Sequence, residues 1–253
     1  NRTVGRFIPE DKPDRAVIPF TPDIEKLTKD FKGEQPKAQG EDFDPSPMNI
    51  ESRTHRGQFK NGMKYAFLPK TTKANMVNTV LTLRMGDENS LAGKGTLSQF
   101  TANLLNKGTK KYSRQTIKDT LDKLKARVNF FGSGANLNVS IQTNKDNLSA
   151  VLSIVTDILK NASFPEKELE EARNEELAGI EEQKSDPQAL VGKAISRHLN
   201  PFPKGDVRYV NTLEEDIEEI KAVKLEDIKK FHQSFYGANN ATVSIVGDFN
   251  EAA

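Results

Sequence analysis

The chain has 253 residues, 29% of them charged, and a formal net charge of +1 at pH 7. This near balance of charge gives no electrostatic basis for binding nucleic acid or an anionic membrane surface. The mean hydropathy is −0.64, and no run approaches the ~18 apolar residues that a membrane-spanning helix needs. The absence of cysteine excludes disulfides, thiol nucleophiles and cysteine-bound zinc, and it fits either redox compartment.

The first fifty residues are polar and contain seven prolines, a composition that predicts an extended connector. Within it we expect a short strand at residues 3–9 and a short helix at residues 24–31. The thin apolar content cannot offset a chain entropy of roughly 1–2 kcal/mol per residue, so we expect mobility unless another surface orders the segment. We assign residues 1–52 to a linker and the tail of a preceding unit. The alternative is the disordered tail of an independent protein.

A regular hydrophobic pattern begins near residue 55. A β-hairpin is predicted around Asn61-Gly62, because this dipeptide favours the tight turn between two antiparallel strands. Apolar alternation or helical spacing predicts the elements that follow. These are a strand at 76–85, helices at 96–106 and 113–125, strands at 127–131 and 137–142, helices at 148–159, 165–184, 187–199 and 225–236, and a strand at 240–249.

Residues 96–109 read T-L-S-Q-F-T-A-N-L-L-N-K-G-T. This stretch resembles the zinc-binding helix of the insulinase/pitrilysin family of metallopeptidases, which typically reads G-L-A-H-F-L-E-H-M-L-F-K-G-T. When both are aligned on the final K-G-T, the inverted zinc motif H-x-x-E-H of the family falls on residues 99–103. In that motif two histidines at i and i+4 hold zinc, and the glutamate beside them acts as general base.

The residues around the motif resemble those of the family, but the metal-binding and proton-accepting side chains of the motif are absent. Gln99 and Asn103 stand at the two histidine positions, and neutral amides are poor zinc ligands. Ala102 stands at the glutamate position and cannot accept a proton. We therefore expect neither a metal site nor catalytic residues in this chain.

The third zinc ligand of the family is a Glu on a later acidic helix, within a pattern like E-R-E-V-I-L-E-E-I. Matching this pattern on Arg173 places the ligand position at Gly179, with Glu175 and Glu176 nearby. A lone carboxylate without two histidine partners is not a zinc site. We interpret the acidic run at residues 166–182 as a solvated helix face rather than a cation site.

The remaining candidate sites have plain interpretations. His55, His198 and His232 are far apart in the sequence, and none is paired with another at i and i+4, so we predict structural or solvent-exposed roles. Residues 93–96, G-K-G-T, lack both the glycine spacing of a phosphate-binding loop and the Ser or Thr directly after its lysine.

The order of the predicted elements resembles one α/β unit of the insulinase family over residues 53–250. Further matches are L-R-M-G-D at 83–87, F-P-K-G-D at 202–206 and F-H-Q-S-F-Y-G at 231–237. The resemblance implies an α+β fold with a mostly antiparallel sheet and helices packed largely on one face. Residues 134–139 also resemble a family strand that pairs with substrate backbone. This predicts a peptide-binding edge strand at Asn138 and Val139, the alternative being an ordinary strand.

The resemblance implies a function for the parent protein rather than for this chain alone. The chain, which begins at Asn1 without Met or signal peptide, would be a fragment of a bacterial zinc metalloendopeptidase, periplasmic or secreted. It would belong to the non-catalytic half that completes the chamber and helps bind peptide substrate. Zinc is expected in the catalytic half, which is the expected partner, and the uncovered face of this unit predicts self-association. The alternatives are a structural or assembly subunit with no role in proteolysis, and an active metalloenzyme with a different site.

Overall fold

The computed structural model describes residues 5, 23–31 and 39–251, and the chain divides into two units, residues 1–36 and 37–253. In the first unit, helix α1 (Ile24–Thr28) begins after Asp23, whose side chain accepts a hydrogen bond from the backbone N–H of Lys26. This confirms the short helix expected there. The expected strand at residues 3–9 lies outside the described residues except for Gly5, and the mobility of this segment stays a prediction.

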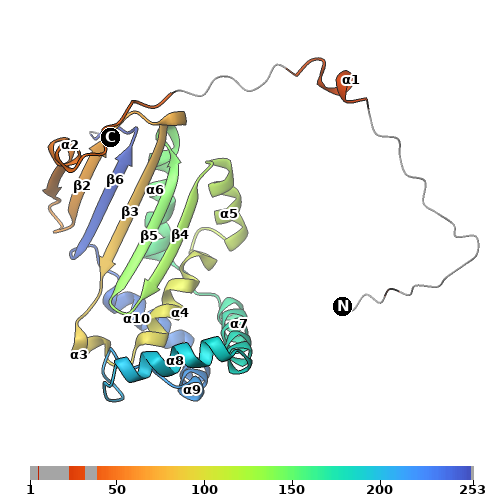
Figure 1. The fold of residues 1–253 in the computed structure, drawn as a ribbon, viewed down its shortest axis with the longest axis vertical. Helices are drawn as coiled ribbons and strands as arrows, with labels where there is room; N and C mark the ends of the chain where they lie inside the picture. Colours follow the sequence, from red (N-terminus) through yellow and green to blue (C-terminus); the bar gives the residue numbers. More distant parts are fainter. Residues whose placement is uncertain (1–4, 6–22, 32–38, 252–253) are drawn as a thin grey trace, which may run out of the picture. The chain divides into compact units, whose positions relative to one another are not determined.

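Six strands among the described residues form one sheet in the order β1-β2-β6-β3-β5-β4 (Figure 1). Neighbouring strands are antiparallel except β2 and β6, which are parallel. The predicted, mostly antiparallel sheet is therefore confirmed. The strands are β1 (His55–Gln58), β2 (Lys64–Pro69), β3 (Met76–Arg84), β4 (Arg127–Ser133), β5 (Asn136–Asn144) and β6 (Ala241–Gly247).

The two faces of the sheet differ as the period-two pattern of its strands requires. In β5 the buried residues Leu137, Val139 and Ile141 alternate with polar residues. On the opposite face Asn138 accepts a hydrogen bond at 2.7 Å from the hydroxyl of Thr82, across the β3–β5 pair. One face therefore meets the core, while the other carries polar residues together with exposed apolar side chains such as Val80 and Phe131.

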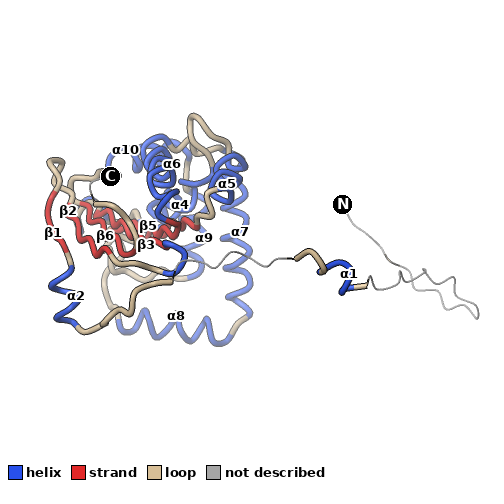
Figure 2. Tube along the Cα trace, turned by 90° about the horizontal axis from the view of Figure 1, so that it is seen from above, coloured by secondary structure: helices blue, strands red, loops and turns tan. Residues whose placement is uncertain are grey.

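Helices cover the apolar face of the sheet, as the resemblance implied. Viewed along the sheet, α4, α5, α6 and α10 lie together on one side of it, whereas α2 and α8 lie away from this layer (Figure 2). The helices of this unit are α2 (Pro47–Arg53), α3 (Glu88–Leu91), α4 (Gly95–Leu104), α5 (Arg114–Lys123), α6 (Leu148–Asn161), α7 (Glu166–Ser185), α8 (Pro187–Leu199), α9 (Leu213–Ala222) and α10 (Leu225–Phe235). Helices α2, α3 and α9 are additions to the predicted set.

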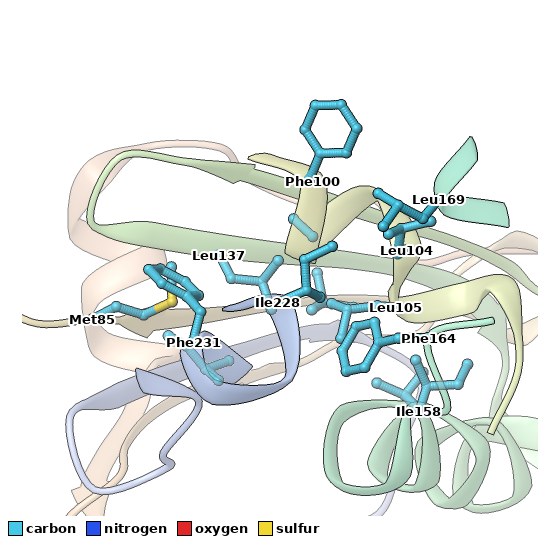
Figure 3. Packing of buried hydrophobic residues seen from close by; sticks show 14 of the residues in the cluster. Met85, Phe100, Leu104, Leu105, Leu137, Ile158, Phe164, Leu169, Ile228 and Phe231 are labelled. Carbon is cyan, nitrogen blue, oxygen red and sulfur yellow. The ribbon is translucent and has the colours of Figure 1, made fainter. Parts of the chain in front are cut away.

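The main core cluster lies where the sheet and helices α4, α6, α7 and α10 meet (Figure 3), and a smaller cluster around Val77, Val243 and Ile245 lies on β3 and β6. From α4 the main cluster receives Phe100 and Leu104, which are 1% and 0% exposed. Burying a side chain of this size contributes about 1.5–3 kcal/mol relative to exposure. Helix α4 is thus a central element of the core as well as the helix that resembles the zinc motif.

Helix α7 is attached to α9 by one arginine. The guanidinium of Arg173 donates hydrogen bonds of 2.8–2.9 Å to the carbonyls of Ile220, Lys221 and Val223. These carbonyls lie at or just beyond the C-terminal end of α9, where helical partners are missing. Two residues of α7, Leu169 and Ile180, are buried in the core cluster, while acidic residues such as Glu170, Glu171 and Glu175 are exposed.

The segment before β1 also contacts the sheet. Arg53 is hydrogen-bonded to the carboxylate of Glu41 and, at 3.0 Å, to the carbonyl of Pro69 at the end of β2. The second carboxylate oxygen of Glu41 accepts from the backbone N–H of Thr71 at 3.0 Å. Residues 41–52, which the sequence assigned to the linker, therefore include a segment held on the end of β2.

The histidines have separate structural environments. His55 lies 2.7 Å from a carboxylate oxygen of Glu251, and His198 is exposed near the C-terminal end of α8. His232 is half-buried, and its Nε2 lies 2.8 Å from the carbonyl oxygen of Leu159 on α6. The contact with α6 gives His232 a structural role, one of the two roles that the sequence predicted for the histidines.

We predict that His232 makes the fold less stable in mild acid. Burial lowers the pKa of His232 below its ordinary value of 6.5, although the bond to Leu159 opposes the shift. The unfolded chain then binds the proton more readily, so the unfolding free energy falls as pH drops below about 6.5 and levels off below the folded-state pKa. Urea unfolding at pH 7.5 and 5.5 measures this difference.

The variant His232→Gln should reduce this pH dependence, because an amide can still donate to Leu159 without titrating. His198→Gln, at an exposed histidine, is the control and should keep the wild-type dependence. Equal dependence in both variants would exclude the assignment to His232.

Candidate functional site

The residues at the former zinc positions lie on α4 and are exposed on one side of it. Gln99 and Asn103 are both exposed, and their spacing of four places them one turn apart on the same side. The side-chain amide of Gln99 donates to a carboxylate oxygen of Glu176 on α7 at 3.2 Å. The fold therefore brings the i, i+4 pair and the acidic helix together, with amides in place of imidazoles.

Ala102, at the position of the general base, is packed against the sheet. It is 1% exposed, and a Cβ placed on Gly132 of β4 would lie 2.4 Å from its own Cβ. Such a distance is far below van der Waals contact, so the approach of α4 to β4 requires glycine at 132. A glutamate at 102 would have to displace the strand or bury its carboxylate.

The third expected ligand position is also unoccupied by a carboxylate. Gly179 of α7 has no atom within 4 Å of a Cβ built on it, so the site has space but no side chain. The residue of α7 that contacts α4 at Gln99 is instead Glu176, one turn earlier. Counting along the sequence could not identify this contact because it depends on how the two helices cross. Among the described residues, no three His, Cys, Asp or Glu side chains form a group that could hold a metal ion.

The predicted peptide-binding edge strand is wrong in its position. Asn138 and Val139 lie in β5, which pairs with β3 on one side and with β4 on the other. Their backbone is therefore not at an edge of the sheet. The edge on this side is β4, where Phe131 is 68% exposed on the face opposite the core. The alternating pattern of β5 fits an inner and an edge strand equally well, so only the strand order separates them.

A cavity of about 770 Å³ lies where the N-terminal ends of α3 and α4 face the loop before α9. Its lining carries charges of both signs that pair with one another or with neighbouring side chains. Lys193 is hydrogen-bonded to Asp216, and Arg208 to Asp206 at 2.8–2.9 Å. These side-chain and backbone bonds from Arg208 lower the pKa of Asp206 to about 2. The Lys193–Asp216 pair connects α8 to α9, and the Arg208–Asp206 pair lies within the loop before α9.

An apolar hollow of about 540 Å³ lies on the helix side of β2, β6 and β3. It is lined by aromatic and aliphatic side chains, including Phe67, Leu152 and Val243. Two hydroxyls in the lining, those of Thr79 and Tyr236, are buried and have no hydrogen-bond partner among the described residues. Sequence reasoning missed this surface because its residues look like ordinary core positions.

Helix α4 thus carries an exposed i, i+4 pair beside the acidic helix α7 and packs against the edge strand β4. Residues 68–202 match the family model described as Insulinase (Peptidase family M16), and residues 222–253 match the one described as Peptidase M16 inactive domain. The first match covers more than half of the 253 residues. The chain belongs to the insulinase family of peptidases, family M16.

Two relatives illustrate the range of the family. The chloroplastic stromal processing peptidase of Pisum sativum is 26% identical over 220 residues, which are 86% of this chain and 17% of that protein. The probable zinc protease PqqL of Escherichia coli is 24% identical over 210 residues, 77% of this chain and 21% of that protein. The chain thus spans about a fifth or less of the length of these relatives.

The fold agrees with solved structures of the family. A peptidase M16 inactive domain from Pseudomonas fluorescens superposes with a TM-score of 0.69 at 21% identity, covering 79% of this chain and 47% of that one. The structure described as the periplasmic protease PqqL from Escherichia coli gives 0.61 at 22% identity, covering 79% and 22%. Among the described residues, no helix is long and apolar enough to cross a membrane.

We predict that Ala102→Glu destabilises the fold strongly. The new carboxylate would be buried against Gly132, and overpacking together with an unpaired buried charge should lower the unfolding free energy by roughly 3–5 kcal/mol. Asn103→Glu, at the exposed neighbour, should change it by no more than about 0.5 kcal/mol. Urea unfolding of both variants checks this; similar stability of the two would contradict the packing described for α4 and β4.

Proposed function

We propose that this chain is the first unit of the non-catalytic half of an insulinase-family zinc metallopeptidase. The observation that carries the proposal is helix α4, which keeps the zinc-motif frame with Gln99 and Asn103 where the metal ligands would be. Ala102 cannot serve as general base and is sealed against β4. The unit contributes surface to the peptidase and no reacting group.

Peptide binding is the role that this surface can keep without metal. The edge strand β4 borders α4 and has a neighbour on one side only. An extended peptide can add to such an edge through backbone hydrogen bonds, with side chains such as Phe131 providing contacts. The proposed peptide-binding strand is therefore β4 rather than the inner strand β5 with Asn138 and Val139.

The proposed partner is the catalytic half of the same protein, which would hold the zinc. Support comes from the relatives named as zinc proteases and from their greater length. The apolar hollow at β2, β6 and α6 is a surface that a companion unit could cover. Left uncovered, the same surface would favour self-association of the isolated chain. A periplasmic location is supported by the Escherichia coli relative alone, since the pea relative is chloroplastic.

A structural or assembly role without proteolysis is the competing function. The activity of the full-length parent protein decides between the two. If this half is non-catalytic but binds substrate, changing Gln99 and Asn103 together to alanine should alter kcat by less than about twofold. Phe131→Ser should raise KM roughly two- to fivefold, the loss expected from a contact of about 0.5–1 kcal/mol.

Val80→Ser is the matched control, because Val80 is also an exposed apolar residue on the face of the sheet opposite the core but lies in the inner strand β3. It should leave KM unchanged. A parent protein without any peptidase activity would support the structural role, and a loss of kcat in the double alanine variant would show that α4 takes part in the chemistry.

We predict that the purified chain contains no stoichiometric zinc and that two substitutions create a zinc site. Gln99→His with Asn103→His places two imidazoles at i and i+4, and Glu176 already contacts position 99. Isothermal titration with zinc should detect one site in this variant. Adding Glu176→Gln should weaken binding at least tenfold, since ligation by a carboxylate would be lost. Stoichiometric zinc in the unaltered chain would contradict the proposed inactive site.

A further inference from the structure

A cleft of about 350 Å³ lies between the edge strand β4 and helix α5, apart from the former zinc positions. Its floor is apolar, formed by residues such as Ile117, Leu121 and Phe130. Because β4 lacks a strand on this side, the cleft lies beside the edge of the sheet. A peptide added to β4 would pass along it with its side chains facing this floor.

The lining of this cleft is strongly basic, although the whole chain is nearly neutral. Four cationic side chains contribute to the lining, those of Lys107, Arg114, Lys118 and Arg127, against one carboxylate, Asp122. The formal balance of the lining is therefore +4 − 1 = +3.

One of these cations already forms ion pairs with carboxylates of α7. Arg114 lies 2.9 Å from a carboxylate oxygen of Glu168 and 3.8 Å from one of Glu171 on α7. Within the described part of the chain, no carboxylate lies within 4.0 Å of the charged nitrogens of the other three. Even with Arg114 discounted and Asp122 counted against them, an excess of two positive charges remains beside the strand edge.

We propose that β4 and this cleft bind extended peptides that carry acidic side chains, with Lys107, Lys118 and Arg127 pairing with the carboxylates. The inference rests on the proposed function and adds the substrate class to it. The strand edge supplies backbone hydrogen bonds without regard to sequence, and the apolar floor accepts the aliphatic parts of the side chains. The excess positive charge supplies the selection, because like charges repel basic peptides and attract acidic ones.

Fluorescence anisotropy with labelled ten-residue peptides tests the inference on the 253-residue chain. One peptide alternates Val and Glu, and its control replaces every Glu by Gln at the same length and shape. Each exposed ion pair contributes a factor of about two to five, so the acidic peptide should bind about tenfold more tightly at low salt. This preference should decline towards unity at 0.5 M salt, where the screening length falls to roughly 4 Å.

Charge reversal locates the site. Lys118→Glu combined with Arg127→Glu should abolish or invert the preference for the acidic peptide. Lys123→Glu, which makes the same change on α5 outside the cleft lining, should retain it. The milder variant Lys118→Gln should lower the preference for the acidic peptide partially. A circular dichroism spectrum equal to that of the unaltered chain would exclude misfolding as the cause.

The outcomes separate this inference from the proposed function. Equal binding of the acidic and Gln peptides would overturn the acidic preference while leaving peptide binding intact. Failure of every peptide to bind, here and in the full-length parent, would overturn the proposed role itself. A single-stranded oligonucleotide that displaces the acidic peptide with equal affinity would show a general anion site and overturn the assignment to peptides.

Discussion

The close contact between α4 and the edge strand β4 is the constraint on which the rest of the unit depends. Ala102 and Gly132 meet where neither can carry a larger side chain, which sets the distance between the helix layer and the sheet. With that distance fixed, Phe100 and Leu104 enter the core cluster. The same contact exposes Gln99 towards α7. The small side chain at position 102 and the tight packing of α4 on the sheet are thus linked.

Much of the fold could be predicted from the sequence, because long periodic segments specify their own secondary structure. The Asn61-Gly62 hairpin and the helix before Pro165 followed directly from local pattern. Helix α9 was missed although Thr212 and Glu215 form a capping box at its start. Its apolar stripe consists of Leu213, Ile217 and Ile220, set among acidic residues.

Strand order and helix crossing could not be predicted from local pattern. Whether Asn138 lies at an edge depends on which strand pairs with β5, and the sequence of β5 alternates in the same way in either position. Likewise, which glutamate of α7 contacts Gln99 depends on the angle between α4 and α7, so counting along the sequence could not identify the contact with Glu176. Candidate residues followed from the motif, whereas the surfaces around them required the three-dimensional arrangement.

The position of β6 has a consequence for how this unit is made. Strand β6 is the last element of the described chain, yet it lies inside the sheet, parallel to β2 and antiparallel to β3. During synthesis, β2 ends at Pro69 and its partner strand β6 begins only at Ala241, so the start of one follows the end of the other by 241 − 69 = 172 positions. Pairings this distant in sequence form slowly, and an unpaired strand edge invites aggregation in the interval. Synthesis of the unit thus passes through a stage in which a chaperone that covers β2 and β3 would aid folding.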